Sequence, residues 1–269
     1  MNQTVAVGAF CASLLLPALS WSAYGMPADS IRADVGPRAP LWMQAVEIFE
    51  TNKDLVPGKA IQKIQEIDDH GRVKSEQTIE SSFSLDEAGK IRSNIIRALE
   101  DGKDITAEQR KKVVEAEKKD AKRKSDKRSH SLSLGNSPFS AERQGDVRVT
   151  ETTTREMVDG AMCIRFEYSY PEKSEDRSKG KPATVTGSAW IEEKTGRPRK
   201  LEFTTDPLPK HAKSMSTTVH YGADENGAWV AKRMLFEASG AFLFLDKRIR
   251  GDFLFSNYWK YEERQNERQ

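Results

Sequence analysis

The chain has 269 residues, and its 43 Lys and Arg nearly balance its 41 Asp and Glu, for a formal net charge of +2. A net charge this small argues neither for nor against a nucleic-acid partner, and we expect none. The two cysteines are Cys11 and Cys163, and because Cys11 lies in a segment predicted below to be removed, no intrachain disulfide is expected. The composition therefore excludes a disulfide-stabilised scaffold and favours one large domain with a hydrophobic core.

The first 25 residues have the pattern of an export signal. They contain no Lys, Arg, Asp or Glu, and residues 5–19 are apolar apart from Ser13. Ala23 and Gly25 supply the small residues that signal peptidase needs, so we predict cleavage after Gly25. The apolar run of about 15 residues is shorter than the roughly 20 that a membrane-spanning helix needs. We therefore expect a periplasmic mature chain, residues 26–269, that forms a single domain.

Two short amphipathic helices are predicted before residue 100. The first spans Pro40–Thr51 and the second spans Ser84–Leu99. In each, apolar residues recur at the three- and four-residue spacing that places them on one helix face. That face carries Leu41, Trp42, Ala45, Val46 and Phe49 in the first helix, and Ile91, Ile95, Ile96 and Leu99 in the second. Both faces are expected to pack on the core.

A third helix, strongly basic, is predicted over Lys103–Arg128, which holds eleven basic and six acidic residues. Thr106 followed by Gln109 fits a capping box at its start. Few of its residues are apolar, so only a thin stripe can be buried, and we expect a charged helical insertion at about residues 86–130 that lies outside the core. Its basic side chains either form a solvated surface or bind anionic lipid head groups and polyanions.

The rest of the chain alternates apolar and polar residues in short runs separated by turn residues, as antiparallel strands do. Asp159-Gly160, between two such runs, suits a two-residue hairpin turn with positive φ. The predicted strands are Ala60–Ile67, Val73–Phe83, Val147–Val158, Ala161–Tyr170, Ala183–Glu192, Arg199–Thr205, Met215–Tyr221, Ala228–Ala238 and a strand pair or bent strand within Ala241–Phe255. Nine or ten strands joined by tight turns form a meander. The predicted fold is therefore α+β, mainly antiparallel β: a curved half-open barrel with helices covering its concave face.

The strand-turn-strand unit Gly187–Leu201 contains a charged turn that ends at Gly196 and is followed by Pro198, and Tyr221, Trp229 and Phe253–Tyr258 continue the same pattern. In these features the chain, over about residues 147–261, resembles the half-barrel superfamily of periplasmic proteins typified by the lipoprotein carrier LolA, its receptor LolB and the sensor RseB. It differs from the carrier in its basic insertion, and from the receptor in having no lipid-attachment cysteine. The resemblance implies a carrier or sensor that holds a lipid, a lipoprotein acyl chain or another apolar ligand between the sheet and the helices.

The residues expected to line such a site are apolar members of the predicted sheet face. They are Phe166, Tyr168, Ile191, Leu201, Phe203, Met215, Tyr221, Met234, Phe236 and Leu243. The alternative is that these residues only fill the core. Trp190 and Trp229 alternate with several of these residues along their strands, so each is expected at the rim of the sheet or on its outer face. Cys163 is expected to be a half-buried, inert thiol on the face of Arg165 and Glu167.

The sequence contains neither the His and Cys spacing of a metal site nor a nucleophile elbow or a phosphate-binding glycine loop. We therefore expect no catalysis, no cofactor and no metal. The second functional hypothesis is a scaffold module that docks through its basic helix onto a membrane surface or an envelope membrane protein. Ligand binding would separate the two hypotheses, because a fully packed core leaves no room for a ligand.

Overall fold

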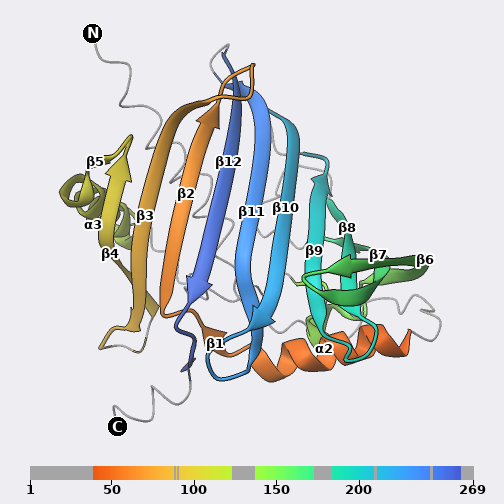
Figure 1. Cartoon of the computed structure of the whole chain (residues 1–269). Coiled ribbons are helices and arrows are strands. Elements are labelled where there is room, and N and C mark those ends of the chain that lie inside the picture. Colours follow the sequence, from red (N-terminus) through yellow and green to blue (C-terminus); the bar gives the residue numbers. More distant parts are fainter. Residues whose placement is uncertain are drawn as a thin grey trace.

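The computed structural model of the chain describes residues 39–87, 89, 91–122, 137–172, 183–208, 211–242 and 245–261 (Figure 1). The predicted export signal, residues 123–128 of the predicted basic helix and the predicted site residue Leu243 lie outside these ranges. Within them, no helix combines the length and the apolar character needed to span a membrane.

Eleven strands form one antiparallel sheet in the order β5-β4-β3-β2-β12-β11-β10-β9-β8-β7-β6. The strands are β2 Lys59–Ile67, β3 Val73–Leu85, β4 Ile91–Glu100, β5 Lys103–Asp104, β6 Arg148–Val158, β7 Ala161–Pro171, β8 Thr184–Glu192, β9 Pro198–Asp206, β10 Ala212–Ala223, β11 Trp229–Phe242 and β12 Leu245–Ser256. Strands that are adjacent in the sheet also follow one another in the chain, except that β2 pairs with β12. β5 and β6 are the two edges, and β6 and β7 are turned strongly relative to β2 and β3 (Figure 1). The sheet is therefore curved and open, as predicted.

Two α-helices and one 3-10 turn are present among the described residues. Helix α2, Pro40–Asn52, contacts β8 and β11, and helix α3, Thr106–Lys122, lies along β4 (Figure 1). The 3-10 turn, η1, is Ala141–Arg143, and β1, Leu55–Val56, pairs with β13, Trp259–Lys260, in a separate small sheet. The strand total exceeds the predicted nine or ten in part because β1, β5 and β13 have two residues each, too few to show an alternation in the sequence.

The helix predicted over Ser84–Leu99 is wrong, because this segment contains the end of β3 and most of β4. Strand β4 pairs with β3 along its whole length. Its register shifts where Glu80 pairs with Arg97 but Ser81 pairs with Ile95, so Ile96 is the extra residue of a β-bulge. The bulge breaks the two-residue alternation and leaves Ile95 and Ile96 as an adjacent apolar pair. That doublet imitates the spacing of an amphipathic helix.

Helix α3 confirms the basic helix from Thr106 onward, but its start differs from the predicted capping box. The Thr106 hydroxyl accepts a hydrogen bond from the Ala98 backbone N–H of β4 at 2.9 Å. Arg110 donates to the backbone carbonyls of Ile95 at 2.9 Å and Ile96 at 3.2 Å. These contacts attach α3 to the sheet beside β5, and they satisfy the two carbonyl groups at the β4 bulge.

The strand register separates an apolar face from a charged face. One row of paired residues across the sheet is Ile79, Gln62, Phe253, Met234, Val219, Leu201, Ala189 and Phe166. The adjacent row, on the opposite face, is Thr78, Lys63, Asp252, Leu235, Thr218, Glu202, Ser188 and Glu167. We call the first the inner face, because α2 packs on it, and the second the outer face. Ion pairs such as Arg250 with Glu237, at 2.8 Å, lie on the outer face.

The main core lies between α2, residues 137–147 and the inner face of β6–β11. Trp42 of α2 is fully buried, with its ring centroid 4.8 Å from that of Phe139, 5.9 Å from that of Phe166 and 6.1 Å from that of Tyr168. Its indole N–H donates to the side chain of Gln144 at 3.1 Å. The first predicted helix is therefore confirmed, and it is the element that covers the predicted site strands β7 and β8.

Candidate functional site

Nine of the ten predicted site residues are described, and all nine lie on the inner face. They fall into two groups that differ in burial. Phe166, Tyr168, Ile191, Leu201 and Tyr221 are buried in the main core. The structure therefore places this group among the chain's own side chains, beneath α2 and residues 137–147.

The second group is only half-buried. Phe203, Met215, Met234 and Phe236 lie on β9, β10 and β11. Across Phe253 and Gln62 the same face continues to Ile79, and across Ala238 it continues to Ile249; both isoleucines are half-buried. We call these six residues the inner-face patch: Ile79, Phe203, Met215, Met234, Phe236 and Ile249. The patch joins the packed core to the β2–β3 side of the sheet.

A polar cluster borders the patch at the β2–β3 turn. Glu66 is directly opposite Ile249, and its carboxylate is 3.0 Å from the ammonium of Lys247 and 3.1 Å from that of Lys74. Burial raises the pKa of Glu66, but the hydrogen bonds from Lys247 and Lys74 outweigh this and hold it below its ordinary value. Sequence reasoning missed this cluster. Glu66 does share the parity of Ile64, but Lys247 lies 181 residues away in the chain.

Buried tyrosines form the opposite border of the patch. The Tyr168 and Tyr170 rings are stacked, with centroids 6.2 Å apart, and Arg143 lies over Tyr170 at 5.0 Å. Burial is the main cause that raises the pKa of Tyr168 well above its ordinary value, and it raises that of Tyr170 to about 12. Among the described residues, the Tyr168 hydroxyl has no hydrogen-bond partner. These hydroxyls therefore stay neutral at ordinary pH, and the two buried rings end the patch at the main core.

Gly187 explains how Tyr168 fits on the sheet. It is opposite Tyr168 on one side and opposite Phe203 on the other. A Cβ atom at position 187 would lie 2.7 Å from the Tyr168 hydroxyl oxygen and would also collide with the Glu202 carbonyl. Only a residue without a side chain allows Tyr168 to lie across this position, in the way that aromatic rings cover glycines in other sheets.

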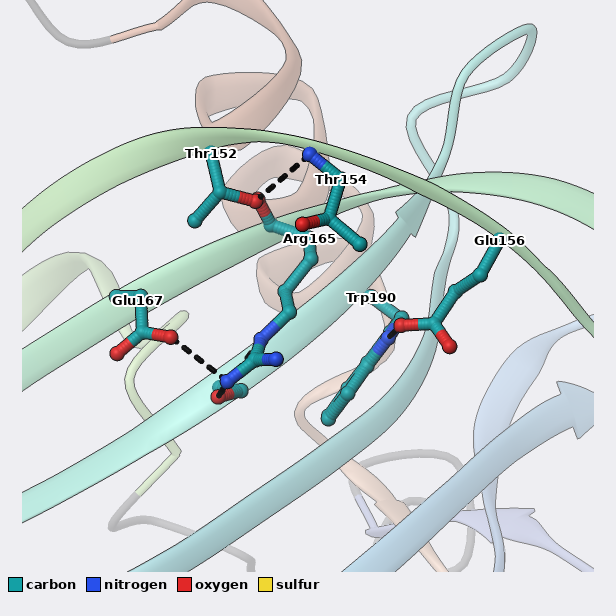
Figure 2. Close-up of polar contacts among 7 residues, drawn as sticks. Thr152, Thr154, Glu156, Arg165, Glu167 and Trp190 are labelled. Carbon is teal, nitrogen blue, oxygen red and sulfur yellow. Dashed lines mark hydrogen bonds and ion pairs between the residues drawn. The ribbon is translucent and has the colours of Figure 1, made fainter.

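The outer face has one buried cluster, centred on Trp190 (Figure 2). The Trp190 ring lies between the guanidinium of Arg165, 5.5 Å from its centroid, and the ammonium of Lys200, 3.7 Å from it. Its N–H donates to Glu156 of β6. Trp190 is therefore on the outer face, one of its two predicted positions, but it is only 4% exposed, and its contacts include Val158 and Glu156 of β6.

Two neighbouring predictions need correction. Cys163 packs with Trp190 and is fully buried, not half-buried. Burial is the main cause that raises the pKa of its thiol to about 11, which agrees with the inert thiol predicted. Trp229 is in the main core and not on the outer face: its N–H donates to the Pro198 carbonyl at 2.7 Å, and Arg199 lies over its ring at 4.6 Å.

Among the residues that the structure describes, no group of three or more His, Cys, Asp or Glu is placed to hold a metal ion. The inner-face patch, with its charged border, is therefore the candidate site. Its chemistry is that of an apolar surface with cations at one end, and it suits binding.

No protein-family model matches the chain, and no curated protein does. Solved structures give weak matches. A DUF1329 family protein from Desulfovibrio piger is 11% identical, with a TM-score of 0.33, over 82% of this chain and 91% of that one. The MucA/MucB complex of Pseudomonas aeruginosa is 8% identical, with a TM-score of 0.23, over 80% of this chain and 93% of that one. The structure of MucB with MucA(peri) is also 8% identical, with a TM-score of 0.19, over 78% of this chain and 93% of that one.

Proposed function

We propose that this protein is a non-catalytic binding protein of the cell envelope that holds an acyl chain, a lipid or another apolar ligand on the inner-face patch. The observation that carries the proposal is the contrast within one sheet face. Under α2, the apolar residues are fully buried by the chain itself. On β9–β11 and beyond, residues as large as Phe236 and Met234 keep part of their surface exposed.

A partly exposed apolar surface of this kind is a sign of a binding site, because leaving it in water is unfavourable. The six patch residues come from five strands, β3, β9, β10, β11 and β12, and β2 lies between the strands of Ile79 and Ile249. A ligand lying across them would replace water at several side chains together. Non-directional contacts of this type recognise hydrocarbon without selecting one molecule.

The proposed location rests on the export signal predicted from residues 1–25, with its charge-free apolar run and small residues at the cleavage site. A carrier or sensor in the envelope would meet acyl chains of lipids or lipoproteins there. Residues 26–269 are the form of the protein on which the function should be tested.

Docking through the basic helix has less support. Arg110 is bound to backbone carbonyls of β4, and Lys112 forms an ion pair with Glu108 at 2.7 Å. These residues already have partners within the chain, so fewer cations are available for a membrane surface or an envelope protein.

The test compares two neighbours on β11 that face opposite sides. Phe236 is on the inner face and Leu235 on the outer face, and both are half-buried. The variants Phe236→Asn and Leu235→Asn introduce the same uncharged group. Burying a phenylalanine side chain is worth about 1.5–3 kcal/mol, so Phe236→Asn should raise the Kd for cis-parinaric acid, a fluorescent fatty acid, at least about tenfold.

Leu235→Asn should leave that Kd within about twofold of the wild-type value, because the outer face would not contact the ligand. Thermal unfolding of both variants checks that they fold. Leu201→Arg is the core control: Leu201 is 2% exposed, so this change should unfold the domain instead of weakening binding alone. A wild-type protein that binds no probe, or equal losses in the two asparagine variants, would refute the proposal.

A further inference from the structure

We propose that the ligand is an anionic amphiphile, with its acidic head group at Lys247 and Lys74 and its hydrocarbon chain along the inner-face patch. This inference rests on the proposed function and adds the chemical class and the orientation of the ligand. It follows from the charge of the Glu66 cluster, from its position at one end of the patch, and from the contrast between the two ends of the sheet.

The cluster is a direct continuation of the patch. Ile249 belongs to the patch, Glu66 is its cross-strand partner, and Lys247 precedes it by two residues on the same face of β12. From Phe253, whose neighbour Met234 is in the patch, to Lys247 is six residues, or about 20 Å at about 3.3 Å per residue. This length suits an extended acyl chain with its polar end at Lys247.

The cluster carries an excess of positive charge. Two ammonium groups share the one carboxylate of Glu66, and in the part of the chain that the structure describes no second acidic partner of Lys74 or Lys247 is found. The Lys247 side chain is 21% exposed and that of Lys74 is 67% exposed, whereas that of Glu66 is only 9% exposed. The uncompensated charge is therefore on the groups that a ligand can reach. A partly desolvated ammonium favours donating a second, charge-assisted hydrogen bond to an anionic head group.

The two ends of the sheet differ in polarity. The Glu66 cluster is at the β2–β3 turn, and the β1–β13 pair is at the opposite end of these strands (Figure 1). At that far end, Val56, Leu85 and Trp259 form an apolar cluster. An amphiphile on the inner face would accordingly have its head at the β2–β3 turn and its tail toward the β1–β13 pair.

The experiment compares cis-parinaric acid with its methyl ester, which has the same chain without the charge, at pH 8 and low ionic strength. Wild-type protein should bind the acid more tightly than the ester. Lys247→Gln should raise the Kd of the acid about fivefold, the size expected for one exposed ion pair, and should leave that of the ester unchanged. Lys63→Gln is the matched control: Lys63 is on the outer face in an ion pair with Glu76, and its loss should change neither Kd.

A second variant predicts a change in the opposite direction. Glu66→Gln removes the carboxylate that competes for the two ammonium groups, so it should lower the Kd of the acid and leave that of the ester unchanged. A purely structural role for the cluster would instead weaken both probes in both variants, together with the thermal midpoint. Equal affinity of the wild type for acid and ester would overturn the head-group assignment while the proposed function stands. Failure to bind either probe would overturn both.

Discussion

Replacing Trp190 with alanine should release β6 from the outer face and expose the thiol of Cys163. Trp190 is almost completely buried, although it lies on the face that is otherwise charged and wet. Truncating a buried tryptophan to alanine costs about 3–5 kcal/mol. Because β6 is an edge strand paired only with β7, we expect much of this cost to appear as local opening of β6.

The labelling rate of Cys163 with a thiol reagent, measured without denaturant, reports this opening directly. In residues 26–269, Cys163 is the single cysteine. A loss of about 3–5 kcal/mol corresponds to a labelling rate roughly 10²- to 10³-fold higher or more, if the whole loss favours the open form. Trp190→Phe keeps the ring in place but removes the N–H that donates to Glu156. Losing that hydrogen bond costs about 1 kcal/mol, so labelling should accelerate only about fivefold.

Urea unfolding of the same variants separates local from global effects. If β6 opens alone, the labelling rate should rise by more than the loss in global stability explains. The reasoning would be refuted if Trp190→Ala labelled no faster than the wild type, since some other group would then cover Cys163. It would also fail if Trp190→Phe and Trp190→Ala behaved alike, because ring burial would then contribute nothing.

Two further outcomes are expected. Gly187→Ala should lower the free energy of unfolding, measured by urea titration, by about 1–3 kcal/mol, because the new Cβ meets the Tyr168 hydroxyl and the Glu202 carbonyl. Gly145→Ala is the control: there is open space around this position, so the same titration should show a change of less than about 0.5 kcal/mol. Burial raises the pKa of Cys163 to about 11 and that of Tyr170 to about 12, so the unfolded chain loses these protons first. Stability should therefore be intact below about pH 8.5 and fall as the pH rises toward 12; equal urea midpoints at pH 8 and pH 11 would contradict this.

Local features of the fold were predictable from the sequence, and features that join distant segments were not. The Asp159-Gly160 turn has positive φ at both residues, as the hairpin signal required, and the apolar spacing of α2 was clear. The pairing of β2 with β12 has no local signal in the sequence, because it joins two strands from opposite ends of the meander. Bulges also defeated the periodicity rules. The bulge at Ile96 gave strand β4 an apolar spacing that is typical of a helix.

The candidate site shows the same division. Parity was enough to place Phe236, Met234 and the other described site residues on one face, since side chains alternate between the two faces along the stretches of strand that hold them. It could not show which of them α2 would cover, because that depends on where Trp42 lies relative to β7. The burial of Trp190 was not predictable for a related reason. The register of β6 against β7 shifts between Glu151 and Arg155, and this irregularity bends β6 toward the outer face, where it contacts Trp190.

The pairing of β2 with β12 also has a consequence for biogenesis. During synthesis β2 is made early, whereas the strand that completes its hydrogen bonds follows almost 190 residues later. In the interval, β2 to β5 can form only a small sheet with one bare edge, which is a template for pairing with other chains. Contacts this distant in sequence also close slowly. The N-terminal strands therefore need protection, by a chaperone or by remaining extended, until the last hairpin has been synthesised.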